Sequence, residues 1–139
     1  MKQLSLEEVE YLAHRLTQEL MSFDEPLPEF STRYKGKLES CLEQPFQTFD
    51  GEDLYPGLVN KAAVLFYLIT KNHPFENGNK RMAVTTTLLF LFKNDHWLEI
   101  EPMVLYEIAI RVADSKPQEK DKIITILKDF FGEFIIGRK

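Results

Sequence analysis

Cysteine and long apolar runs are scarce in this sequence. Cys41 is the single cysteine among 139 residues, so the chain cannot form an internal disulfide, and Cys41 cannot hold a zinc ion alone. The longest apolar stretches, such as 88–92, fall far short of the ~20 residues that cross a membrane. The first residues, MKQLSLEEVEYLAHRL, carry acidic side chains where a signal peptide would be apolar. We therefore expect a cytoplasmic protein without a membrane segment.

An excess of basic charge is also missing. Lys and Arg number 17 against 22 for Asp and Glu, which gives a formal net charge of −5. A nucleic-acid-binding surface needs a basic face, so nucleic acid is not an expected partner, whereas a small local anion site is compatible with this charge. The 44% hydrophobic and 28% charged residues are typical of globular proteins. We predict a single domain over residues 1–139.

Hydrophobic residues recur at helical spacing along most of the chain. Ser5 and Glu8 form a capping box at the start of the first helical segment. Helices are predicted over 6–21, 37–44, 58–72, 79–93, 102–114 and 117–131, with a loop over 22–31 and with Ser115 and Gln118 capping the last helix. The helices over 58–72 and 79–93 are apolar on several sides, so we expect them to pack together at the centre.

Two segments depart from the helical pattern. Asp50-Gly51 is a strong two-residue hairpin signal, and it predicts a small β-hairpin flap. The tail over 133–139 is apolar in its first half, so we expect it to dock on the core or to pair with a partner, a second copy of the chain in a homodimer included. The predicted fold class is therefore all-α, a compact helical bundle with a small β-hairpin flap.

The polar loop between the two central helices concentrates reactive side chains. It reads His73-Pro-Phe-Glu-Asn-Gly-Asn-Lys-Arg81, and below it is called the motif loop. Cations in the first turn of a helix oppose its dipole, so Lys80 and Arg81 indicate that an anion such as phosphate binds among them. Gly78 permits close approach of a ligand, and His73 can accept a proton near neutral pH. A structural turn and a metal site are the alternatives that the residues alone leave open; the P-loop spacing is absent.

The motif loop resembles the signature of the Fic/Doc family. The Fic pattern is H-P-F-x-[D/E]-G-N-G-R and the Doc pattern is H-x-F-x-D-x-N-K-R. The chain matches at His73, Phe75, Asn79, Lys80 and Arg81, and the segments 53–56, 61–63 and 4–9 also resemble Doc-type toxins. The resemblance extends to about residue 114, which makes 115–139 a C-terminal helical extension.

This resemblance implies a Fic-type helical fold that uses ATP, with Mg²⁺, to modify a hydroxyl of a protein target. Because Lys80 stands where Fic proteins have their second glycine, it favours phosphoryl transfer of the Doc type, whose target is elongation factor Tu. The implied partners are this translation factor and an antitoxin peptide or protein. By position, the resemblance implies that His73 is the catalytic base and that Asn77 is the metal position. The implied phosphate-binding residues are Gly78, Asn79, Lys80 and Arg81. The implied target-binding flap comprises Thr48, Phe49, Asp50, Gly51, Glu52 and Asp53.

Three departures from the family pattern bear on two alternative functions. Asn77 replaces the family's acidic metal ligand, and a neutral amide oxygen binds a hard dication more weakly. Val84 replaces an arginine of the AMP-transferring proteins, which counts against AMP transfer, and the C-terminal extension exceeds what a minimal Doc toxin needs. The alternatives are AMP transfer of the Fic type and a catalytically degenerate module that binds a nucleotide or a partner.

Overall fold

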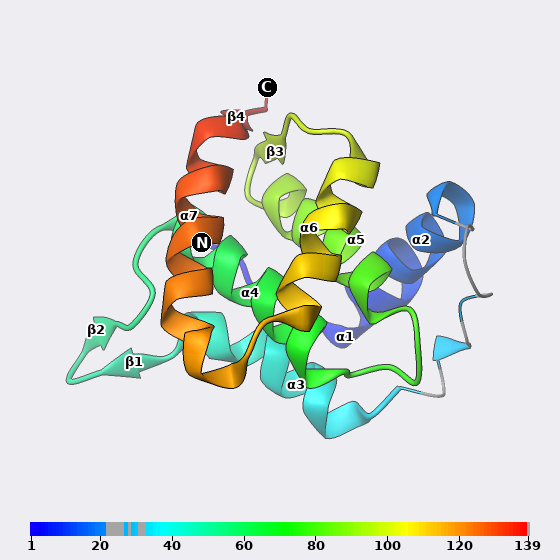
Figure 1. Ribbon diagram of the computed structural model, residues 1–139, viewed down its shortest axis with the longest axis horizontal. Helices are drawn as coiled ribbons and strands as arrows, with labels where there is room; N and C mark the ends of the chain where they lie inside the picture. Colours follow the sequence, from blue (N-terminus) through cyan, green and yellow to red (C-terminus); the bar gives the residue numbers. More distant parts are fainter. Residues whose placement is uncertain (22–26, 28, 31–32, 139) are drawn as a thin grey trace.

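The computed structural model describes residues 1–21, 27, 29, 30 and 33–138. The first helix consists of α1 (Leu6–Glu8), a π-helical segment, Val9–His14, and α2 (Arg15–Leu20), which follow one another without a break. The other helices are α3 (Lys35–Glu43), α4 (Leu58–Asn72), α5 (Asn79–Lys93), α6 (Pro102–Asp114) and α7 (Lys120–Phe134). Short 3-10 turns lie at Gln44–Phe46 and Pro117–Glu119. The strands are β1 (Thr48–Phe49), β2 (Glu52–Asp53), β3 (His96–Leu98) and β4 (Ile135–Gly137). The predicted all-α class with a small hairpin is confirmed (Figure 1).

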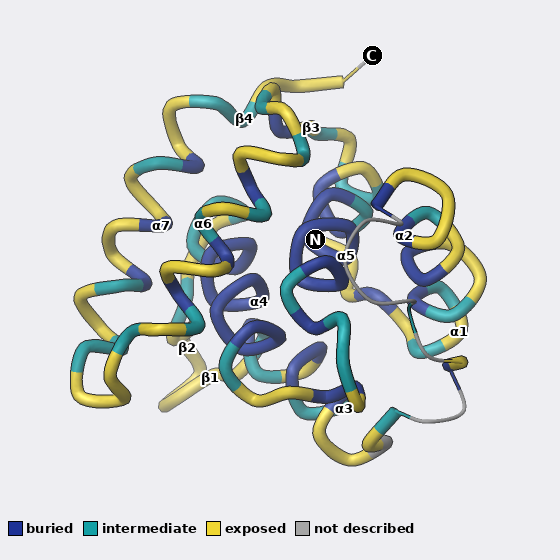
Figure 2. Tube along the Cα trace, turned by 45° about the vertical axis from the view of Figure 1, so that its right-hand side comes forward, coloured by how far each residue is buried: buried dark blue, intermediate teal, exposed yellow. Residues whose placement is uncertain are grey.

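Helices α4 and α5 form the centre of the bundle. Every residue from 61 to 70 is buried, and most of α5 is buried too (Figure 2). The other helices pack around this pair: α3, α6 and α7 lie against α4, while the first helix and α6 lie against α5. The central position predicted from the apolar surface of both segments is therefore confirmed. Among the described residues, no helix is both long and apolar enough to span a bilayer.

The predicted hairpin forms at the expected residues. Thr48 pairs with Asp53 and Phe49 with Glu52, and the intervening Asp50 and Gly51 have φ of 54° and 81°. Positive φ at both central residues is the geometry that an Asp-Gly hairpin turn provides.

Lys61, on the first turns of α4, fixes the hairpin to the bundle. Its Nζ donates to Asp53 Oδ2 at 3.1 Å and to the Tyr55 carbonyl at 2.6 Å, and it lies 5.4 Å from the centre of the Phe46 ring. A two-stranded ribbon is marginal by itself, so these contacts decide where it points.

Two details at the C-terminal end bear on the sequence prediction. The tail takes the first of its two expected arrangements and docks on its own chain: Trp97 pairs with Ile136, and Phe134 and Ile135 pack against the core. Ser115 does not cap the last helix, because it ends α6 and its hydroxyl donates to the Val112 carbonyl at 2.5 Å. The Glu119 carboxylate accepts from the Lys116 N–H at 3.1 Å and so caps the turn Pro117–Glu119, whereas Glu119, the N-cap residue of α7, makes no side-chain cap bond to that helix.

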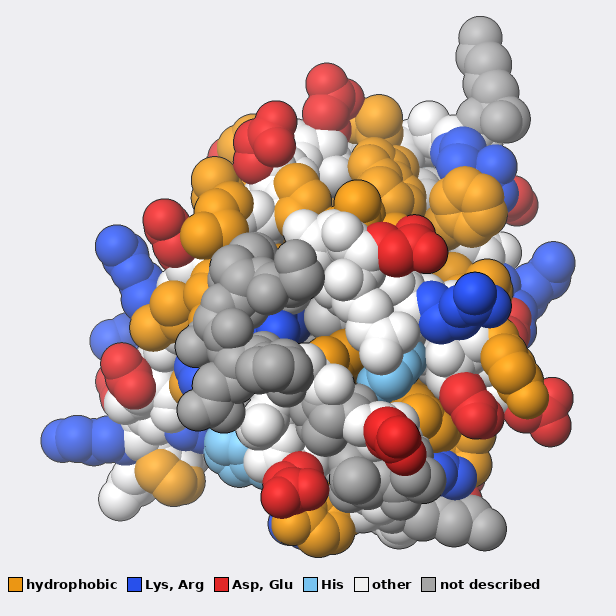
Figure 3. All heavy atoms as spheres, turned by 90° about the vertical axis from the view of Figure 1, so that its right-hand side faces the viewer, with side chains coloured by type: hydrophobic (Ala, Val, Ile, Leu, Met, Phe, Trp, Pro, Cys, Tyr) orange, Lys and Arg blue, Asp and Glu red, His pale blue; other side chains and the backbone are white. Residues whose placement is uncertain are grey.

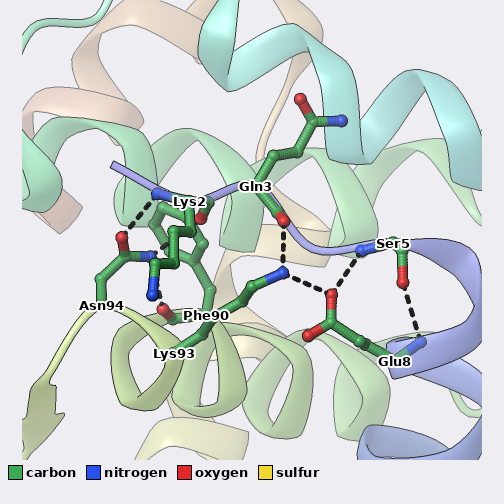
Figure 4. A network of polar contacts seen from close by, with 7 residues as sticks. All are labelled: Lys2, Gln3, Ser5, Glu8, Phe90, Lys93 and Asn94. Atoms are coloured by element: carbon green, nitrogen blue, oxygen red, sulfur yellow. Dashed lines mark hydrogen bonds and ion pairs between the residues drawn. The ribbon is translucent and has the colours of Figure 1, made fainter.

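The segments near both chain ends attach to the same end of α5. Asn94 exchanges two hydrogen bonds with the backbone of Lys2, and Lys93 contacts the Gln3 carbonyl and the Glu8 carboxylate at 2.9 and 2.6 Å (Figure 4). On the other side, Arg138 lies 3.7 Å from the Phe92 ring centre and donates to the Phe92 carbonyl. The motif loop lies at the opposite, N-terminal end of α5.

Candidate active site

His73 lies at the point where α4 ends. Pro74 follows it, and a residue before proline is disfavoured in the helical region, so the helix stops there. The backbone of His73 takes the left-handed conformation, with φ 50° and ψ 61°. This conformation turns the chain sharply into the motif loop, and the imidazole remains exposed at the surface.

Asn79 holds the motif loop in shape. Its Oδ1 accepts from the Phe75 N–H at 2.9 Å, and its Nδ2 donates to the Phe75 carbonyl at 3.1 Å and lies 3.4 Å from His73 Nδ1. Phe75 itself is buried, with its ring centre 5.9 Å from that of Phe30. The predicted phosphate-binding residue Asn79 thus uses its side chain inside the loop, which leaves its backbone N–H as the group that could meet a ligand.

Gly78 precedes α5 with φ 78° and supplies no side-chain cap. A β-carbon at this position would collide with the Leu27 side chain and would lie 3.3 Å from an Arg81 terminal nitrogen. Glycine is therefore required by the backbone conformation, and a larger residue would in addition displace the tip of the Leu27 side chain. The N–H groups of the first turn receive no side-chain cap from this position, which is the arrangement that binds anions at a helix N-terminus.

A pocket of about 330 Å³ joins these parts, lined by His73, Glu76, Asn77, Gly78, Asn79, Lys80 and Arg81. Lys80 is half-buried at its wall. Arg81 is buried, and its Nη1 donates to the Met21 carbonyl at 3.2 Å. The face that carries the motif loop shows histidine, cationic and acidic side chains among uncharged and apolar ones (Figure 3). The predicted base, phosphate-binding and metal positions thus lie around one cavity.

The surroundings of His73 favour its neutral form. Partial burial lowers the pKa of the imidazole below its ordinary 6.5, and the positive charges of Lys80, Lys37 and Lys71 lower it further. A neutral imidazole has a ring nitrogen that can accept a proton. The site therefore combines a proton acceptor with a cationic, N–H-rich pocket.

The family model of the Fic/DOC family matches residues 3–91. The chain belongs to the Fic/Doc family. It is also 38% identical over 66 residues to Toxin Doc of Mycolicibacterium smegmatis (strain ATCC 700084 / mc(2)155), an alignment that covers 48% of this chain and 51% of that toxin. The match thus spans about half the length of this curated relative, and the likeness to the Doc toxin branch accords with Lys80 in the motif loop.

The hairpin of this Fic/Doc chain lies away from the motif loop. It attaches at Lys61, and the twelve residues of α4 from Lys61 to His73 span about 18 Å at 1.5 Å per residue. The two features project from opposite sides of the bundle (Figure 1). The six predicted flap residues, Thr48 to Asp53, are exposed, and none of them lines the pocket. Their role in binding a target stays a prediction.

The segment between α2 and α3 contacts the motif loop instead. Besides Met21 and Leu27, it contributes Phe30, packed on Phe75, and Tyr34, whose N–H donates to the Pro74 carbonyl at 2.7 Å. Sequence reasoning predicted only a loop over 22–31, and most of that loop lies outside the described residues. The signal available in the sequence was the presence of apolar side chains, Leu27 and Phe30, in a proline-containing loop.

The pocket offers few oxygen ligands for a magnesium ion. Among the described residues, no three His, Cys, Asp or Glu side chains cluster as a metal site. Glu76 and Asn77 do line the pocket, and Mg²⁺ commonly binds through one or two protein oxygens together with substrate phosphates and water. These two residues therefore fit an ion that arrives with a nucleotide.

Proposed function

We propose that this protein is a Doc-like toxin that transfers the γ-phosphoryl group of ATP to a hydroxyl of a protein target. The observation that carries the proposal is the pocket itself, in which His73, held in its neutral form, shares a wall with Lys80 and Arg81 at the start of α5. Lys80 separates this loop from the Fic pattern and supports phosphoryl transfer. A translation factor, with elongation factor Tu as the first candidate, is the proposed target.

Each residue then has a defined task. The triphosphate binds at the N-terminus of α5, where backbone N–H groups and Lys80 neutralise its charge, and Arg81 adds positive charge from within the wall. His73 accepts the proton of the target hydroxyl while that oxygen bonds to the γ-phosphorus and ADP leaves. Mg²⁺, when bound through Glu76 and Asn77, supplies further charge neutralisation.

Labelled ATP tests the reaction directly. Purified protein is incubated with Mg²⁺, elongation factor Tu and either α- or γ-³²P ATP. We expect label on the target from the γ position alone. The label should be lost in His73→Ala and retained in the matched control His96→Ala, since His96 lies in β3, which follows the far end of α5. Label from the α position would replace this proposal with AMP transfer of the Fic type.

Absence of label from both positions is resolved by calorimetry with ATP. Nucleotide binding without transfer to elongation factor Tu or to any protein of a cell extract would identify a degenerate binding module, in keeping with Asn77. The substitution Asn77→Asp provides the confirmation, because restored transfer would show that the missing carboxylate disabled the site.

The toxin role has its own test. The relative is named a toxin, and we propose that this chain likewise arrests growth and is neutralised by an antitoxin protein or peptide. Induced expression of the wild type should stop growth of a bacterial host, whereas His73→Ala at equal expression should not. Growth arrest by both proteins would show that toxicity does not depend on the proposed chemistry.

A further inference from the structure

We propose that Lys71 is a positioning residue for His73, and that through it the C-terminal extension supports the active site. Lys71 fastens the last turn of α4 to the end of α6, where the segment 115–138 begins. The inference rests on the proposed function, in which His73 is the base, but it assigns a task to a residue outside the motif loop and to the unexplained C-terminal part of the chain.

The contacts of Lys71 are those of a helix clamp. Its Nζ donates to the carbonyls of Ala113 and Ser115, at 3.2 and 2.5 Å. The last carbonyls of a helix lack partners within the helix and carry the negative end of its dipole. The Lys71 ammonium, from a different helix, therefore completes the C-terminal cap of α6 and ties the two helix ends together.

The backbone next to Lys71 needs such support. His73 occupies the left-handed region, which is unfavourable for a residue with a β-carbon and persists only when the surroundings impose it. On the loop side, the Tyr34 N–H holds the Pro74 carbonyl and Asn79 holds Phe75. On the helix side, Asn72 bonds to Cys41 and Lys71 bonds to the end of α6, so the backbone at His73 is held from both directions.

The clamp continues into the rest of the extension. From Ser115 the chain passes through the turn Pro117–Glu119 into α7, which packs along α4. Phe131 of α7 meets Phe66 of α4 edge to face, with ring centres 5.5 Å apart. The extension therefore holds α4 along its length through α7 and holds its last turn through Lys71.

The charged groups that face His73 come from three elements and the loop. Lys71 belongs to α4, Lys37 to α3 and Lys80 to α5, and Glu76 lines the same pocket from the motif loop. Removing the Lys71 ammonium leaves the other two cations in place. A measurement on the His73 ring in a Lys71 variant therefore reports the effect of Lys71 while the effects of Lys37 and Lys80 stay constant.

The test compares Lys71→Met with Lys71→Arg and with Lys122→Met. Methionine keeps the aliphatic length but cannot donate to the two carbonyls, arginine can donate to both, and Lys122 is an exposed lysine of α7 whose loss changes net charge equally. We expect Lys71→Met to lower kcat about tenfold with KM for ATP unchanged, because misplacement of a catalytic group slows the chemical step. Lys71→Arg should restore most of the activity, and Lys122→Met should match the wild type.

Nuclear magnetic resonance of the imidazole gives a second readout that needs no activity. The chain has three histidines, so His73→Ala identifies the His73 ring signal. In Lys71→Met that signal should shift and broaden and titrate at higher pH, while the signals of the other two stay unchanged. Unaltered kcat and an unaltered His73 signal in Lys71→Met would each overturn the proposal.

The two proposals fail in distinguishable ways. If the wild type transfers no label, the phosphoryl-transfer function fails, and broadening of the His73 ring signal in Lys71→Met, which loss of the Lys71 charge alone would not cause, then decides whether Lys71 positions the imidazole. If the wild type is active and Lys71→Met loses activity with an unmoved ring signal, Lys71 acts by another route and the positioning role is refuted. Equal loss of activity in Lys71→Arg would refute it as well.

Discussion

At the scale of single residues, His73 illustrates a conflict between stability and function. The left-handed position that follows a helix is ordinarily glycine, since glycine adopts it without steric cost. This chain places an imidazole there, with φ 50°, beside a pocket that contains Lys80 and Arg81. Histidine at this position is therefore explained by the proposed role of its imidazole, because the backbone conformation alone would favour glycine.

Two substitutions at this residue separate the two effects. His73→Ala and His73→Gly both remove the base, so neither should transfer phosphate. Alanine retains the strain of a β-carbon at positive φ, so His73→Gly should be more stable than His73→Ala by about 1 kcal/mol. Urea unfolding measures the difference, and equal stabilities would show that the backbone at this position relaxes when the imidazole is removed.

The lowered pKa of His73 predicts the shape of the pH profile. A base must be unprotonated, so kcat/KM should rise with pH through the His73 pKa, with the midpoint of the rise below pH 6.5, the ordinary value for histidine. Removing a cation that lowers this pKa should move the rise to higher pH, and Lys37→Gln does so without touching the motif loop. Lys37→Arg retains the charge and should leave the profile in place; a rise above pH 6.5 in the wild type would contradict the assignment.

The sequence predicted which residues surround the pocket but not how each is used. Spacing alone indicated that His73 and the residues 77–81 would lie together, and the pocket contains them all. It did not reveal that the Asn79 side chain bonds to the Phe75 backbone, because that depends on the path of the loop. Nor did it reveal the contacts from Leu27 and Tyr34, which depend on how separate helices pack.

At the scale of elements, helix bounds were predictable where strong stop signals occur. The helices α4, α5 and α6 begin and end as predicted because Gly57, Gly78 and Pro102 mark their starts, while His73-Pro74 and Asn94 mark ends. The β3–β4 pair could not be predicted, because each strand has three residues and the partners are far apart in sequence. Pairing at such separation is decided by packing, which periodicity does not encode.

The hairpin depends on one buried lysine. Lys61 is 3% exposed in its side chain and relies on Asp53, whose own side chain is 47% exposed. Asp53→Ala removes the carboxylate from a buried ammonium, and because Asp53 is half in solvent we expect a loss of about 1–2 kcal/mol in the free energy of unfolding. Glu52→Ala, on the same strand and exposed, should change it by less than about 0.5 kcal/mol. Thermal or urea unfolding of both variants checks this; equal effects would mean that the ion pair does not anchor the hairpin.

At the scale of the whole molecule, stability depends on covering α4. The Phe131 side chain is fully buried against Phe66 at the contact between α7 and α4. Phe131→Ala should cost about 3–5 kcal/mol, since it leaves a cavity beside the central helix. Ile126→Ala, in the same helix but 52% exposed, is the matched control and should cost less than about 1 kcal/mol. A loss of less than about 1 kcal/mol in the free energy of unfolding for Phe131→Ala would show that the extension stabilises the protein through contacts other than Phe131 with Phe66.

The fastening of both chain ends to one end of α5 has a practical consequence. Lys2 and Arg138 each contact residues 92–95, while the pocket lies at the opposite end of a helix that is about 22 Å long. A fluorescent donor and acceptor attached near residues 2 and 138 would therefore sit close together in the folded protein and separate when it unfolds. Because neither dye would be near the nucleotide pocket, the same labelled molecule could report folding and turnover at once.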